Sequence, residues 1–149
     1  MTIEENVQIV KDFLAAIGRG DKQRVLALVA EDIEWIIPGE DWPLAGTHRG
    51  QAELAAVLQK ASEEVEMTYP EPPEFVAQRD RVLVVGVATG KIKATNKSFK
   101  DYWVFDITVR DRKVTRIREY IDTQALARAS EIDGSGLAQR WPSAAIGSG

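Results

Sequence analysis

The sequence predicts an α+β fold, with three helices from the N-terminal half packed on a curved, mostly antiparallel sheet from the C-terminal half. Apolar residues recur every three or four positions through most of residues 1–64, which is the period of a helix. From residue 67 onward the pattern changes to extended and alternating segments. A strongly bent sheet wrapped around helices encloses a cone, so we expect a pocket in its interior.

Two helices are expected at the N-terminus. Thr2 and Glu5 have the spacing of a capping box, so the first helix should begin at Ile3, and the glycines at 18 and 20 should end it. Asp21 can cap a second, short helix. Apolar residues form the inward side of these helices: Ile3, Val7, Val10, Phe13, Leu14, Ile17, Val25, Leu26, Leu28 and Val29.

A short strand and a long loop follow. The strand carries three apolar residues on one face, and a Pro-Gly pair at positions 38 and 39 ends it. The loop contains Trp42 and the only histidine, His48, and we interpret it as the lid or rim of the pocket. A third helix is expected from about Gln51 to Glu64. The apolar strand residues are Ile33, Trp35 and Ile37.

The second half predicts a run of strands. Prolines at 70, 72 and 73 make Met67–Val76 an edge strand or an extended loop. Val82–Thr89 is almost continuously apolar, so we expect both of its faces to be covered, and Gly86 suggests a bulge or bend. Phe99–Val109 alternates, and one face should point into the pocket: Asp101, Trp103, Phe105, Ile107 and Val109.

The last strand is expected over Val114–Asp122, with Glu119 on the inner face and Tyr120 on the outer face, where we expect a dimer interface. A short final helix, Thr123–Ser130, can be capped by the aspartate before it. The domain is therefore expected to span residues 1–130. Residues 131–149 are rich in Gly, Ser, Ala and Pro and should form a loosely held tail, with Trp141 as a candidate anchor.

Composition argues against several functions. A net charge of −4 is unfavourable for nucleic-acid binding. The absence of cysteine excludes disulfides and thiolate chemistry and fits a cytoplasmic protein. We expect no membrane span and no signal peptide. One histidine, no acidic calcium loop, no nucleotide-binding loop and no nucleophile elbow lead us to expect no metal, no cofactor and no covalent catalysis.

Three segments carry a family resemblance: FLAAIGRGDKQRVLALVAEDIEW, PLAGTHRGQAEL and VTRIREYIDTQAL. With the element order, they resemble the SnoaL-like group of the nuclear transport factor two-like (ketosteroid isomerase-like) superfamily over about Ile3 to Ala129. The resemblance implies a cone-shaped fold, a hydrophobic pocket, and a homodimer through the outer face of the sheet. Members include isomerases, polyketide cyclases, epoxide hydrolases, dehydratases and proteins without activity, so the fold does not fix the reaction.

When the resemblance is carried over residue by residue, this chain lacks the residues that two of the family's mechanisms require. The tyrosine that donates to the oxyanion in ketosteroid isomerases corresponds to Phe13, and their aspartate base corresponds to Ile37. The tyrosine and asparagine that hold the water in limonene-epoxide-type hydrolases correspond to Trp35 and Ile37, and their arginine corresponds to Val87. One acidic residue remains on the last strand, Glu119, as SnoaL-type polyketide cyclases require.

Glu119 shares its strand face with Ile117 and Ile121. If the carboxyl group is buried without a cation, its pKa rises and it can act as an acid or a base near neutrality. The alternatives are an ion pair with Arg116 or Arg118, or simple exposure.

Two further candidates could assist it. Asp101 should face the same interior by strand alternation; the alternative is a solvated residue at the start of its strand. His48 could act as a base or orient a ligand at the pocket mouth; the alternative is a bond to a backbone carbonyl or a cap of the third helix. The residues expected to line the pocket, or else to form ordinary core, are Phe13, Trp35, Ile37, Trp42, Val87, Trp103, Phe105 and Ile117.

We therefore expect the chain to bind a small hydrophobic, cyclic molecule. If it is an enzyme, it should perform cofactor-independent acid-base chemistry with Glu119, assisted by Asp101 or His48. The rival hypothesis is a non-catalytic small-molecule binding protein or a dimerisation module. A deep cavity with both acids inside favours an enzyme, whereas a cone filled by Trp35, Trp103 and Phe105 favours a structural module.

Overall fold

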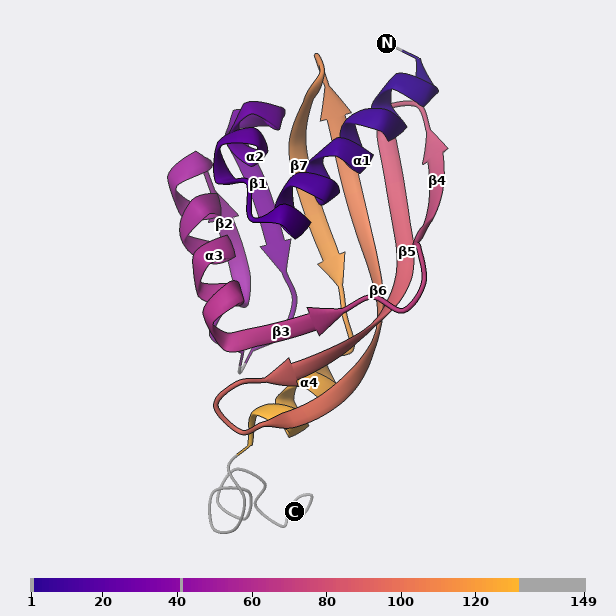
Figure 1. The fold of residues 1–149 in the computed structure, drawn as a ribbon. Coiled ribbons are helices and arrows are strands. Elements are labelled where there is room, and N and C mark those ends of the chain that lie inside the picture. Colours follow the sequence, from indigo (N-terminus) through magenta and orange to yellow (C-terminus); the bar gives the residue numbers. More distant parts are fainter. Residues whose placement is uncertain (1, 41, 132–149) are drawn as a thin grey trace.

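The structure, a computed structural model, describes residues 2–40 and 42–131. Three helices lie against a curved sheet, and a fourth lies at the end of the cone (Figure 1). The elements are α1 (Ile3–Arg19), α2 (Lys22–Leu28), β1 (Val29–Ile37), β2 (Gly46–Arg49), α3 (Gln51–Glu64), β3 (Val65–Thr68), β4 (Glu74–Gln78), β5 (Arg81–Ile92), β6 (Lys97–Arg110), β7 (Lys113–Tyr120) and α4 (Thr123–Ser130). None of the helices in these described ranges is long and apolar enough to cross a membrane.

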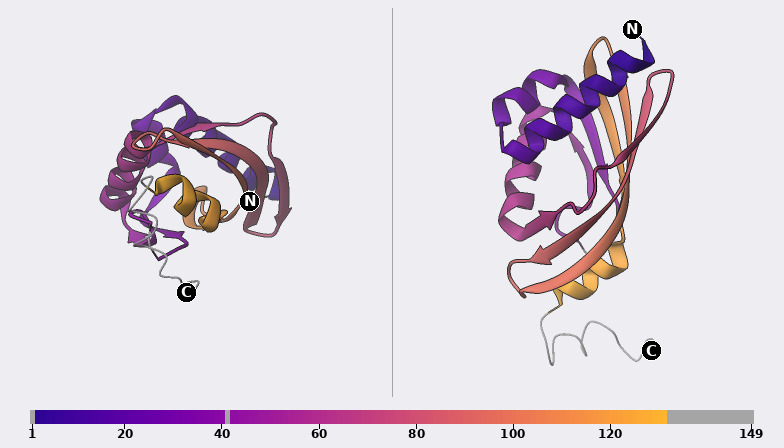
Figure 2. Two further views of the ribbon diagram at one scale, coloured as in Figure 1. Left: turned by 90° about the horizontal axis from the view of Figure 1, so that it is seen from below. Right: turned by 45° about the vertical axis from the view of Figure 1, so that its right-hand side comes forward.

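The sheet has the strand order β2-β1-β7-β6-β5-β3, and β4 also pairs with β5. The β1–β7 pair is parallel and the other pairs are antiparallel. Strands β5 and β6, with 12 and 14 residues, are long enough to bend around the helices (Figure 2). β4 pairs with the first half of β5 and β3 with its last four residues. The curved α+β cone predicted from the sequence is confirmed.

The helix ends follow from local chemistry. Thr2 and Glu5 form the predicted capping box at the start of α1, and Gly20 ends this helix with a left-handed φ of 69°. Asp21 accepts a hydrogen bond from the backbone of Arg24 and caps α2. The bounds predicted for α3 and α4 are the observed ones.

Two predicted loops contain strands. Residues 46–49, expected to be part of a long loop, form the edge strand β2, in which His48 pairs with Trp35 of β1. The segment expected as one edge strand or loop is two strands, β3 and β4, separated by the prolines at 70, 72 and 73. The sequence prediction missed β2 and the division into β3 and β4, because strands of four or five residues are too short to show a clear periodicity. The expected edge position of this segment is confirmed, because β3 and β4 each pair only with β5 among the described residues.

Gly86 does not form the predicted bulge. The register of β5 and β6 is continuous through it, with Gly86 opposite Trp103. A Cβ atom at position 86 would lie 2.6 Å from Cζ2 of Trp103, so the glycine makes room for this indole ring on the inner face of the sheet. Within the single chain, the outer face of β5 is not covered as expected, because Val85 on this face is 36% exposed.

Two hydrophobic clusters hold the cone together. The larger one lies between the helices and the inner face of the sheet; its most deeply buried side chains include Val10, Phe13, Ile33, Leu54, Val84, Ile107 and Ile117. The smaller one seats α4 through Ile92, Phe99, Leu126 and Ala129. Seen along the cone, α4 lies across its end (Figure 2). Glu131, expected in the tail, is buried, and Lys97 Nζ donates to its carbonyl at 2.8 Å. The rest of the predicted tail, with Trp141, lies outside the described residues.

Gly86→Ala should destabilise the protein by about 1–3 kcal/mol, because the rigid Trp103 ring must move away from the added methyl group. Gly18→Ala is the matched control, because a Cβ atom there meets nothing within 4 Å in α1, and this variant should be up to about 1 kcal/mol more stable than the wild type. Urea denaturation measures both values. A Gly86→Ala variant as stable as the wild type would contradict this role of Gly86.

Candidate functional site

The cone encloses a cavity of about 490 Å³, which lies within the usual range for small-molecule sites. Its wall combines the inner face of β1, β6 and β7 with residues of α1, α3, β3 and α4. Exposed lining residues lie at the end of α1, at the start of α2, on α3, after β3 and before α4: Gly18, Gly20, Lys22, Gln59, Ser62, Tyr69 and Asp122. The cavity is open to solvent at these residues.

Glu119 lies in this wall, directly opposite Phe105 in the β6–β7 ladder. Trp35 Nε1 donates a hydrogen bond of 2.6 Å to Glu119 Oε1. The alternative considered for Glu119, an ion pair with Arg116 or Arg118, is wrong. Strand alternation places both arginines on the other face of the sheet, and Arg116 pairs with Glu34. Glu119 therefore meets the cavity as a carboxyl group without a cationic partner in the described residues.

Burial raises the pKa of Glu119 to about 7, against a usual value of 4.5. The Trp35 N–H opposes this rise because it stabilises the carboxylate. The nearby charge of Asp101 raises the pKa of Glu119 further. Part of the Glu119 surface remains open to the cavity. Near neutral pH the group is consequently available both as an acid and as a base.

Asp101 is 5% exposed and lines the same cavity, as predicted. The alternative of a solvated residue at a strand start is wrong, because β6 begins at Lys97, earlier than expected. Burial raises the pKa of Asp101, while the backbone N–H of Asp122, which donates to Oδ1 at 2.8 Å, lowers it in part, and the charge of Asp122 raises it. In the cavity wall, Glu119 and Asp101 thus each have one carboxyl oxygen held by an N–H donor.

Tyr69 belongs to the site although nothing in the sequence singled it out. It follows β3, is 58% exposed, and its ring stands edge-on to Trp103 with the centroids 6.1 Å apart. Partial burial raises the pKa of Tyr69, and the charges of Glu119 and Asp101 raise it further. The prolines around it predict only an extended segment, which carries no information about the direction of the side chain.

His48 does not line the cavity in which Glu119 and Asp101 lie. It lies on β2, and its Nε2 is 2.7 Å from the carbonyl oxygen of Leu44, which is the backbone bond considered as an alternative. A ring nitrogen in contact with a carbonyl oxygen is a donor, so this bond fixes the ring as part of the edge strand.

Five of the eight residues expected to bind the ligand line the cavity: Trp35, Ile37, Trp42, Trp103 and Phe105. Phe13 and Ile117 are buried in the core behind the wall. Val87 was placed wrongly, because the register of β5 sets it opposite Tyr102 on the outer face of the sheet, while Gly86 and Ala88 face inward.

The aromatic rings form a wall and leave the cavity open. Phe105 and Trp103 have centroids 4.8 Å apart, and Trp35 stands nearly perpendicular to Phe105 at 6.4 Å. Both are ordinary geometries for packed aromatic pairs. Since the rings pack against one another along the sheet, the space in front of them is available to a ligand.

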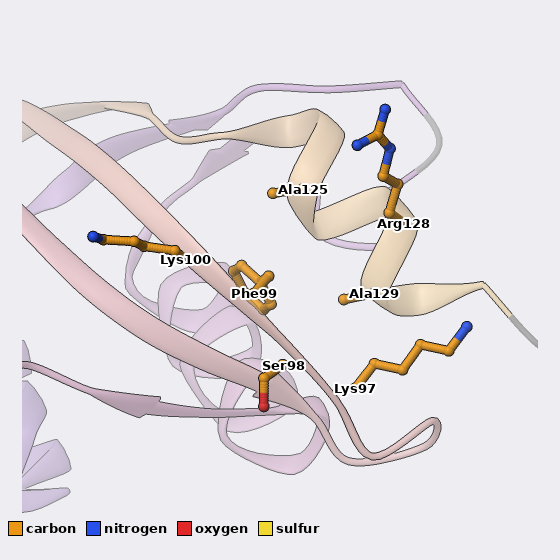
Figure 3. A pocket seen from close by; sticks show the side chains of 7 residues that line it. All are labelled: Lys97, Ser98, Phe99, Lys100, Ala125, Arg128 and Ala129. Atoms are coloured by element: carbon orange, nitrogen blue, oxygen red, sulfur yellow. The ribbon is translucent and has the colours of Figure 1, made fainter.

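A second hollow lies on the surface between β6 and α4 (Figure 3). Its three cationic side chains point in different directions, so they do not converge on a common anion (Figure 3). Lys97 donates to the carbonyl of Glu131, and Lys100 lies over the ring of Tyr102. The internal cavity is therefore the better candidate. The lining residues of this hollow are Lys97, Ser98, Phe99, Lys100, Ala125, Arg128 and Ala129.

Solved structures with the same fold are numerous. A nuclear transport factor two-like protein from Burkholderia xenovorans LB400 is 74% identical, with a TM-score of 0.85 over 88% of this chain and 99% of that one. TerC, co-crystallised with polyporic acid, is 26% identical, with a TM-score of 0.75 over 84% of this chain and 97% of that one. A putative polyketide cyclase from Xanthomonas campestris pv. campestris is 22% identical, with a TM-score of 0.73 over 86% and 98% of the two chains, and shows likeness of fold.

Sequence comparison agrees with the structural one. An uncharacterised protein of Mycobacterium tuberculosis is 26% identical over 120 residues, which cover 80% of this chain and 91% of that protein. Residues 10–117 match the SnoaL-like domain family. The chain therefore belongs to the SnoaL-like family, within the nuclear transport factor two-like superfamily.

Proposed function

We propose that the chain binds a small hydrophobic, cyclic molecule in the cone cavity and performs acid-base chemistry on it with Glu119. One observation carries this proposal: a carboxyl group with a pKa of about 7 lies in an aromatic-walled cavity without a cation beside it. Such a group costs stability in a purely structural role, and perturbed carboxyl groups in cavities are enriched at active sites.

The size and lining of the cavity support a cyclic ligand. A volume of about 490 Å³ accommodates a molecule of a few fused or linked rings. The flat rings of Trp35, Trp103 and Phe105 offer faces and edges on which such a molecule can stack. TerC, a relative with 26% identity, was crystallised with polyporic acid, which supports an organic ligand for this chain as well.

The proposed chemistry needs only proton transfer. A protonated Glu119 donates to an oxygen of the ligand, and an ionised Glu119 removes a proton from a neighbouring carbon or from a hydroxyl group. Asp101, in the same cavity, supplies the second carboxyl group. Two nearby acids do not ionise with equal ease, so one can hold a proton while the other accepts one. Isomerisation, ring closure and hydrolysis all fit this scheme.

The second candidate function is binding without chemistry. It is favoured by the absence of the isomerase and hydrolase residues, since Phe13 and Ile37 occupy the positions of the oxyanion donor and the base of related isomerases. It predicts a ligand that binds in the cavity and leaves unchanged.

Glu119→Gln separates the two candidates. A thermal-shift screen of polyketides, terpenoid epoxides and steroids identifies ligands, because a molecule that binds the folded state raises its melting temperature. Liquid chromatography with mass spectrometry then follows the ligand. Glu119→Gln should keep ligand binding and reduce turnover about 10²–10⁴-fold, because glutamine can still accept from Trp35 but exchanges no proton.

Glu66→Gln is the control, since Glu66 is exposed on β3 and does not line the cavity. It should turn over the ligand at the wild-type rate. A wild-type protein that binds a ligand and returns it unchanged over long incubation supports the binding-only function and rejects catalysis.

The ionisation of Glu119 should also be visible in protein stability. Between pH 4.5, the usual pKa of the unfolded chain, and about 7, the folded protein keeps a proton that the unfolded chain has released. The wild type should therefore lose stability as the pH rises through this range, by at most on the order of 3 kcal/mol, and lose no more above it. Glu119→Gln should lack this component. Urea denaturation at a series of pH values gives the difference, and parallel curves for the two proteins would show that Glu119 titrates normally.

We also propose that a second copy of the chain covers the outer face of the sheet, as the family resemblance implies. This face exposes Tyr102 by 66% and Tyr120 by 53%, with Val85 and Val104 beside them in the ladder. Multi-angle light scattering should give the mass of two chains for the wild type. Tyr102→Glu should shift the mass to one chain, and Tyr69→Glu, on the cavity side, should leave it at two. A monomeric wild type contradicts the dimer.

A further inference from the structure

Two of the tryptophans that line the cavity, Trp35 and Trp103, differ in one respect. Trp35 Nε1 donates to Glu119 Oε1 at 2.6 Å. Trp103 Nε1 is buried and has no hydrogen-bond partner within the described part of the chain. Both rings contact the same aromatic neighbour, Phe105. The pair therefore allows the effect of the indole N–H to be separated from the effect of a large apolar ring.

The position of the Trp35 ring is fixed by packing. It is 4% exposed, with Phe13 at 6.3 Å on one side and Phe105 at 6.4 Å on another. Its strand runs parallel to β7, with Trp35 in register with Ile117, so that Glu119 follows two residues later on the same face. A ring held in this way keeps its N–H directed at the carboxyl group of Glu119.

The hydrogen bond makes the two carboxyl oxygens unequal. An indole nitrogen donates and does not accept, so Oε1 is an acceptor in both ionisation states of Glu119. When Glu119 takes up a proton, this proton therefore resides on Oε2. Glu119 is the only group to which the Trp35 N–H is bonded, and neither oxygen has another partner in the described chain.

We propose that Trp35 is a positioning residue: it holds Glu119 by Oε1, favours the carboxylate form, and leaves Oε2 as the one oxygen that exchanges a proton with the ligand. The exchange with a ligand rests on the function proposed above. The bond itself and its effect on the ionisation of Glu119 do not, and they can be measured in the protein without any ligand.

Several other ionisable groups face this site. The charge of Asp101 on β6 raises the pKa of Glu119, and the charge of Glu119 raises the pKa of Tyr69, which follows β3. Asp122 and Lys22 also line the cavity. Trp35→Phe leaves all of them in place and removes one N–H donor. Because burial then acts on Glu119 without this opposing bond, the pKa of Glu119 should rise further.

The experiment follows the ¹³C signal of the Glu119 side-chain carboxyl carbon during a pH titration of the full chain, with Glu119→Gln to assign it. Trp35→Phe should raise the pKa by about one to two units, since a hydrogen bond to a charged group contributes about 1.5–3 kcal/mol. Trp103→Phe is the matched control and should shift it by less than half as much, because its N–H has no partner in the described residues. An unchanged titration in Trp35→Phe, or an equal shift in Trp103→Phe, overturns the proposal.

A second variant guards against a folding defect, because Trp35→Phe removes part of a buried ring. Site-specific incorporation of 3-benzothienylalanine at position 35 keeps the size and shape of the side chain and replaces the N–H by sulfur. It should give the same rise of the Glu119 pKa as Trp35→Phe. A wild-type titration in this variant contradicts the role of the N–H.

The outcome is distinguishable from that of the proposed function. If a ligand is turned over, the pH profile of kcat/KM should move in Trp35→Phe by the shift measured by NMR, and should stay in place in Trp103→Phe. If no ligand is turned over, the proposed catalysis fails while the titration still decides whether Trp35 controls the ionisation of Glu119. A profile that stays in place while the titration moves rejects proton exchange through Glu119.

Discussion

The hydrogen bond between Trp35 and Glu119 joins the two halves of the fold. Trp35 belongs to β1, which follows the N-terminal helices, and Glu119 belongs to β7, the last strand of the meander. These strands form the parallel pair through which the helical half enters the sheet. A buried carboxyl group costs folding free energy unless a donor meets it, and the indole N–H that β1 places beside Glu119 offsets part of this cost. The position of Glu119 in the aromatic wall and the chemistry proposed for it depend on this contact, which also limits how far burial raises the pKa of Glu119.

The site also depends on which side chains of its neighbouring strands point to the inner face of the sheet. Glu119, Phe105 and Trp103 share the inner face because residues on a strand alternate between faces, and the β6–β7 register sets Glu119 opposite Phe105. Asp101 lies two residues before Trp103 on the same face, where α4 closes the end of the cone. Asp122 caps α4 with its side chain and holds Asp101 with its backbone N–H. Asp122, at the start of α4, therefore fixes both the helix that closes the end of the cone and the second acid, Asp101.

The sequence predicted best those features that a few neighbouring residues determine. Thr2, Glu5, Asp21 and Asp122 fix helix ends through local caps, and the alternation from Asp101 to Val109 identifies the inner face of β6. The features it missed depend on partners far away in the chain. Val87 is outside because of its pairing with Tyr102, His48 is bound to an edge-strand carbonyl, and Tyr69 reaches the cavity through the curvature of β5 and its pairing with β3. Register and curvature are set by the whole sheet, so single-segment patterns carry no record of them.

Gly86 has a consequence for the shape of the cavity. It contributes no side chain to the cavity, yet the indole of Trp103, which lines the cavity, lies against it. This part of the cavity wall is thus supported from the neighbouring strand β5. A larger residue at this position would displace the tryptophan, and with it the rings of Tyr69 and Phe105 that pack against it. A change of one hydrogen to a methyl group on β5 is therefore a route by which this architecture can reshape its cavity while Glu119 and Asp101 keep their places on β7 and β6.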